Sequence, residues 1–178
     1  RALLILFVII GIVVEAVWLE KGHETYVWVR PAAGVLYVGA ALLGFELLTV
    51  ESTDAFRRLV AEGVPTALGV HPSLANTMLL PILWATYSLP LALLGFRRRS
   101  NALRYTGLAV LAVAAGWVAV HGSGFVPIST AYLPLLNLRA VAFGFVLAAL
   151  ALHGRLARRH GDADPWAETL QATLRQAM

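Results

Sequence analysis

The sequence predicts an all-α protein, a transmembrane helical bundle of about five spans. Hydrophobic residues make up 59% of the 178-residue chain and charged residues only 13%, about half the share found in soluble domains. The charges are clustered, which leaves several uncharged runs near the ~20 residues that a helix needs to cross a bilayer. None of these runs alternates apolar and polar residues, as the strands of a membrane β-barrel do.

The first two spans are predicted at residues 2–19 and 31–50. Glu15 interrupts the first, and Trp18 suits the membrane interface near its end. The second begins with Pro31, a favoured residue of a helix's first turn, and carries Glu46 near its end.

The segment from Glu51 to Ala75 differs from its neighbours and predicts a short helix lying on the membrane surface at residues 55–62. Ser52, Thr53 and Asp54 are typical N-cap residues. Within 55–62 the apolar and charged side chains fall on opposite helix faces, as in helices that lie in the interface plane.

The third and fourth spans, 78–96 and 105–120, form a hairpin around a basic turn that contains Arg97, Arg98, Arg99 and Arg104. The fifth span is predicted at 135–152, and a basic tail at 153–178 contains a short helix at 166–176. We therefore divide the chain into a bundle at 1–152, expected to be part of a longer multi-spanning chain, and this juxtamembrane tail.

Short loops rich in arginine remain in the cytoplasm. The turn at 97–104 and the basic start of the tail fall on the same side of an alternating chain, so both are predicted to be cytoplasmic. The surface helix and the uncharged loop at 121–134 are then external. Because positive-inside sorting explains the net charge of +4, we expect no nucleic-acid partner.

Several stretches within about 49–152 are distinctive: Leu83-Trp84-Ala85-Thr86-Tyr87, the run from Leu94 to Leu108, Thr49-Val50-Glu51, the run from Tyr132 to Arg139, and Ala142-Phe143. Together they resemble a family of bacterial multi-spanning membrane proteins known as domain of unknown function 2339. The resemblance implies a multi-pass protein of the bacterial cytoplasmic membrane and no specific reaction.

Two carboxylates within spans, Glu15 and Glu46, are the most conspicuous candidates for a site, since an uncompensated charge in a bilayer is costly. Arg30 enters the second span from the side near Glu15, and Arg139 enters the fifth from the side near Glu46. Two structural ion pairs would satisfy all four charges. A proton- or ion-coupled site and simple snorkelling to the interface are the alternatives.

No cofactor or metal site is predicted. His121 and His153 lie at opposite membrane sides, which argues against a bis-histidine haem, and the chain has no cysteine and no metal-binding histidine spacing. Glu51, Asp54 and His71 would be the candidates for an external membrane transferase, but isolated acidic loop residues are usually just solvated.

Small residues recur every four positions at Ala140, Gly144 and Ala148, and at Ala112 and Gly116. Such stripes allow two helix backbones to approach closely, either within the bundle or against another subunit. Together these features favour a non-catalytic structural or assembly subunit that packs against lipid and other membrane helices. A component of an envelope-substrate transporter or flippase, and an external-face transferase, are the alternatives.

Overall fold

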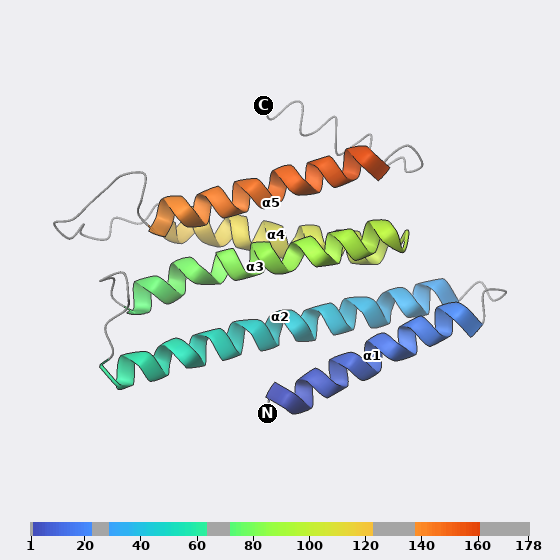
Figure 1. Ribbon diagram of the computed structural model, residues 1–178, viewed down its shortest axis with the longest axis horizontal. Coiled ribbons are helices and arrows are strands. Elements are labelled where there is room, and N and C mark those ends of the chain that lie inside the picture. The colour runs from blue at the N-terminus through green and yellow to red at the C-terminus, as the bar shows by residue number, and fades with distance from the viewer. Residues whose placement is uncertain (1, 23–28, 64–71, 123–137, 161–178) are drawn as a thin grey trace.

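The computed structural model describes residues 2–22, 29–63, 72–122 and 138–160, and these residues form five α-helices and no strand. The helices are α1 (Ala2–Gly22), α2 (Val29–Ala61), α3 (Pro72–Arg97), α4 (Asn101–Gly122) and α5 (Leu138–His160). Successive helices run in opposite directions, so the chain forms an antiparallel bundle (Figure 1). All five are long and apolar enough to cross a membrane. The predicted all-α, multi-pass architecture is confirmed.

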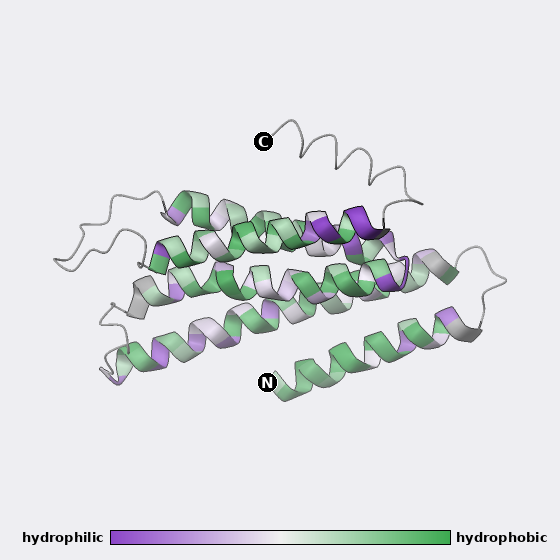
Figure 2. Ribbon diagram, turned by 45° about the horizontal axis from the view of Figure 1, so that its top comes forward, coloured by the Kyte–Doolittle hydropathy of each residue, from purple (hydrophilic) through white to green (hydrophobic). Residues whose placement is uncertain are grey.

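Hydropathy is distributed as a membrane protein requires. Apolar residues cover most of the length of the helices. Strongly hydrophilic ones gather at the end of the bundle that holds the α3–α4 turn and the end of α5, and others lie along the last turns of α2 at the opposite end (Figure 2). Large apolar side chains also point outward. On α1, Leu3, Leu4 and Phe7 are 72%, 70% and 72% exposed, an arrangement that is favourable in lipid and costly in water.

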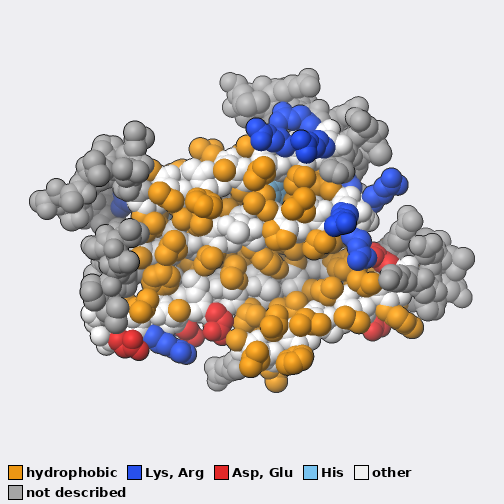
Figure 3. All heavy atoms as spheres, viewed as in Figure 1, with side chains coloured by type: hydrophobic (Ala, Val, Ile, Leu, Met, Phe, Trp, Pro, Cys, Tyr) orange, Lys and Arg blue, Asp and Glu red, His pale blue; other side chains and the backbone are white. Residues whose placement is uncertain are grey.

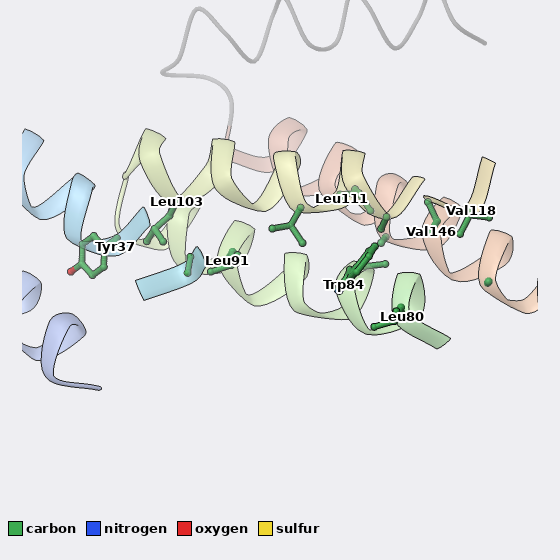
Figure 4. Close-up of a cluster of buried hydrophobic side chains, with 14 of the residues drawn as sticks. Tyr37, Leu80, Trp84, Leu91, Leu103, Leu111, Val118 and Val146 are labelled. Atoms are coloured by element: carbon green, nitrogen blue, oxygen red, sulfur yellow. The ribbon is translucent and has the colours of Figure 1, made fainter. Parts of the chain in front are cut away.

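Helix α3 is central, because it packs against α2, α4 and α5, whereas α1 packs against α2 alone among the described helices. The core lies mostly between α3 and α4 (Figure 4). At Gly107 the backbones approach so closely that a Cβ atom would lie 3.0 Å from the Ser88 carbonyl oxygen. A Cβ atom at Gly95 would lie 2.7 Å from the Arg104 amide nitrogen. Glycine therefore permits this close helix pair.

The α3–α4 turn is a Schellman motif centred on Arg99, whose φ is 52°. The Ser100 amide donates to the Gly95 carbonyl (2.9 Å) and the Arg99 amide to the Phe96 carbonyl (3.3 Å). This turn holds its arginines at the end of the bundle where α5 also ends, and Figure 3 shows Lys and Arg side chains gathered there.

The prediction of a separate surface helix at 55–62 is wrong. Helix α2 is continuous from Val29 to Ala61. Gly63, whose φ is 65°, lies just beyond its end. Ser52, Thr53 and Asp54 are good caps only where a helix starts, and no glycine or proline lies between Gly44 and Gly63 to interrupt α2 there. With 33 residues, α2 is about 50 Å long. The predicted helix at 166–176 and the loop at 123–134 lie outside the described residues.

Candidate functional site

Glu46 lies about halfway along the length of the bundle. On one side of it along α2, the Ala41 carbonyl accepts a hydrogen bond from the Tyr87 hydroxyl (3.0 Å). On the other side, the Thr49 hydroxyl accepts one from the Trp84 indole N–H (2.9 Å). Tyr87 and Trp84 lie midway along α3, so Glu46 is level with the centre of that span, deeper than the position one turn from the boundary that the sequence suggests.

The Glu46 side chain points away from the bundle. It lies on an outward stripe of α2 with Val35, Leu42 and Val50, and all four residues are exposed. No hydrogen bond or ion pair to the Glu46 carboxylate is found among the described residues. Helices α2 and α5 make no contact, so the structure does not bring Glu46 and Arg139 together.

Glu15 is also exposed, on the outward side of α1 beside Val14 and Trp18. Its carboxylate likewise has no partner within the part of the chain that the structure describes. The Arg30 side chain lies outside that part, so the pairing of Glu15 with Arg30 stays a prediction. Two outward, apolar helix faces thus each carry one carboxylate.

A third carboxylate is paired. Glu20, in the last turn of α1, accepts a hydrogen bond from the Tyr37 hydroxyl of α2 (3.0 Å) and an ion-paired hydrogen bond from the Arg98 guanidinium (3.3 Å). Three helices therefore meet in one polar cluster at the arginine-rich end. Sequence reasoning places Glu20 in a loop and misses this cluster. The signal was present, because Glu20 and Arg98 belong to the same predicted side of the membrane.

Two tryptophans, Trp84 midway along α3 and Trp117 nearer the far end of α4, connect the helices. Pro81 has no N–H for the Thr77 carbonyl one turn earlier in α3, and the Trp117 indole N–H of α4 donates to that carbonyl instead (2.9 Å). Trp84 packs edge-on against Trp117, with ring centroids 5.4 Å apart. These contacts hold α2, α3 and α4 together; they offer no reactive group.

The histidines form no metal or haem site in the described residues. His121 stacks on Trp117 with centroids 4.0 Å apart. His153 is buried at 3% exposure, its Nδ1 lies 2.9 Å from the Ala149 carbonyl oxygen, and its Nε2 has no hydrogen-bond partner there. No group of three or more His, Cys, Asp or Glu side chains that could hold a metal ion occurs in the described part of the chain.

The predicted small-residue stripe of α5 faces outward. Gly144 and Ala148 are exposed, and nothing lies within 4 Å of a Cβ atom built at Gly144. Gly116 of α4 is equally open. The inward face of α5 consists instead of Ala142, Val146, Ala149, His153 and Ala157. Around Gly144 and Ala148, the predicted stripe therefore packs against no other helix among the described residues.

No family model, curated protein or solved structure matches this chain. The resemblance to the bacterial membrane family stays a prediction. Any functional conclusion therefore depends on the geometry itself.

Proposed function

We propose that this protein is a non-catalytic subunit of a membrane assembly in the bacterial cytoplasmic membrane, with its arginine-rich end in the cytoplasm. The observation that supports this proposal is the position of Glu46. Its carboxylate is exposed at mid-span on a face otherwise formed by Val35, Leu42 and Val50. A helix of another subunit that covers this face would remove the carboxylate from lipid.

The energy involved is large enough to direct assembly. A charged carboxylate at the centre of a membrane helix costs about 3 kcal/mol on insertion scales. A partner helix that donates a hydrogen bond or carries a cation at the same depth would recover much of this cost. The carboxylate would thus both favour association and select the partner and its register.

Among the described residues, a second copy of this chain does not provide the required cation. The described arginines lie at or near helix ends, in the last turns of α2, at the α3–α4 turn and at the two ends of α5. No exposed Lys, Arg or His lies at mid-span in the described helices. We therefore propose a different polypeptide as partner, with Lys, Arg, His or an amide side chain near the middle of one span.

The test places a photo-crosslinking amino acid at Leu42 or Val50, which flank Glu46 on the same face, and at Ala112 on the outward face of α4 as a control. We expect Leu42 and Val50, but not Ala112, to crosslink to one membrane protein in cells. Glu46→Leu should reduce that crosslink at least tenfold. Glu62→Gln, which removes an exposed carboxylate from the end of α2, should leave it unchanged.

The captured protein must have a polar or basic residue at mid-span, and its replacement by leucine should reproduce the Glu46→Leu loss. Crosslinking that survives Glu46→Leu would refute the proposal. A carboxylate that acts in transport behaves differently: Glu46→Gln would preserve the assembly and abolish substrate flux in vesicles. That result would favour the transporter alternative.

A further inference from the structure

A groove lies between α1 and the α3–α4 hairpin. Because α1 packs on α2 alone, its other flank is separated from α3 by a pocket of about 160 Å³. The groove is lined by Val13 and Val17 of α1, Tyr37 of α2, Leu91 and Leu94 of α3, and Arg98 of the α3–α4 turn. Val13 and Leu94 are 36% and 47% exposed, so the groove opens sideways, toward the lipid.

The walls of the groove suit hydrocarbon. Branched apolar side chains predominate. The lining also includes Tyr37 and Tyr87, whose hydroxyls already donate hydrogen bonds, that of Tyr37 to Glu20 and that of Tyr87 to the Ala41 carbonyl. The groove therefore presents few groups that would bind a polar ligand or hold ordered water, which needs several polar partners.

The length of the groove matches one leaflet. On α1 it extends from Ile9 to Val17, about 12 Å along the helix axis. Half of a bilayer's hydrocarbon core is about 15 Å. The groove starts at the arginine-rich end, where Arg98 lies, and stops before the opposite leaflet.

The charge at the groove's entrance is positive. Arg98 lines the groove, its side chain is 43% exposed, and its ion-pair partner there is Glu20 at 3.3 Å. Arg97 and Arg99, also exposed, adjoin it in the chain. Three consecutive arginines against one carboxylate leave an excess of positive charge at headgroup level, which attracts anionic lipids.

We propose that this groove is a binding site for an anionic phospholipid of the arginine-side leaflet. One acyl chain lies between α1 and α3, and the phosphate pairs with Arg98 in competition with Glu20. The proposal does not depend on the assembly role of Glu46, because the groove lining does not include Glu46 or its outward neighbours on α2 and the ligand is different.

Native mass spectrometry of the purified protein, titrated with equal amounts of phosphatidylglycerol and phosphatidylcholine, tests the headgroup. We expect phosphatidylglycerol to be preferred about fivefold, the effect of one basic side chain near the membrane surface. Arg98→Gln should bring the preference close to one. Glu20→Gln should increase it, because it removes the competing carboxylate. Arg158→Gln, at the same end of the bundle but on α5, is the matched control and should have no effect.

Filling the groove tests the acyl chain. Leu94→Trp and Val13→Phe, from opposite rims, should each abolish most retention of either lipid, whereas Leu93→Trp, an exposed neighbour outside the lining, should not. Thermal unfolding of each variant identifies any that fails to fold. If one groove-filling variant fails, lipid retention by the other one decides the test. Equal binding of the two lipids by the wild type would overturn the proposal. So would an Arg158→Gln effect as large as that of Arg98→Gln, or full retention in both folded groove-filling variants.

Discussion

At the scale of single residues, polar groups freed by the backbone find partners in neighbouring helices. Pro81 lies inside α3 and is buried, and it leaves the Thr77 carbonyl without its usual amide donor. Trp117 supplies the missing N–H across the α3–α4 interface at 2.9 Å. A residue that normally breaks a helix thus becomes a point of attachment between two helices, as happens in membrane proteins.

This arrangement predicts a specific coupling between Trp117 and Pro81. Trp117→Phe keeps an aromatic ring but removes the N–H, so the Thr77 carbonyl loses this donor and the unfolding free energy should fall by about 1–3 kcal/mol. Pro81→Ala restores the intrahelical donor. In the Pro81→Ala variant, the loss of unfolding free energy caused by Trp117→Phe should be smaller than in the wild type by about 1 kcal/mol or more. Thermal or denaturant unfolding in detergent measures all four proteins, and an equal loss in both backgrounds would show that the carbonyl is not responsible.

At the scale of helices, the sequence predicts where most spans lie and misjudges which faces pack. Apolar runs and arginine clusters are enough to locate five spans and the α3–α4 turn, because lipid demands long apolar helices. The same demand hides the packing faces, since core-facing and lipid-facing positions are both apolar. On α5 the outward Gly144 and the inward Ala149 look alike in sequence, and only buried His153 distinguishes the two faces.

The error over α2 has a related cause. Ser52, Thr53 and Asp54 are compatible with a cap and also with the interior of a helix that leaves the membrane. With about 50 Å of length against a hydrocarbon core of ~30 Å, α2 must extend well beyond one surface. Because the start of α2 and the α3–α4 turn lie at the other end of the bundle (Figure 1), the extension is the charged segment near Arg57 and Arg58.

That extension predicts a labelling pattern. The chain has no cysteine, so single cysteines can be introduced at Arg58, in the last turn of α2, and at Ser100, in the α3–α4 turn. A membrane-impermeant maleimide should label Arg58→Cys in intact cells, and Ser100→Cys only after the membrane is opened. Labelling of both positions from one face would contradict the antiparallel span arrangement. Exclusive labelling of Ser100→Cys in intact cells would reverse the proposed orientation.

At the scale of the whole molecule, stability is uneven. Among the described helices, α3 packs on three neighbours and α1 on one. Only 6% of the apolar stretch of α1 is buried, against 44% of that of α3. Elements with few buried contacts open first, at a free energy below that of global unfolding. The Arg98–Glu20 ion pair is a direct link from the α3–α4 turn to α1, so it should contribute to how readily α1 separates from the rest.

Hydrogen exchange in detergent measures this separation. Amides of α1 should exchange faster than those of α3 in the wild-type protein, because α1 can detach while α3 and α4 stay packed. Arg98→Gln should accelerate exchange in α1 and leave α3 and α4 unchanged; the ion pair is partly exposed, so the expected acceleration is about two- to fivefold. Arg158→Gln, which lies on α5 and away from α1, should have no effect on α1. Uniform exchange across α1 and α3 would mean that the bundle opens as one unit, and the groove beside α1 would then have no flexible wall through which a lipid chain could enter.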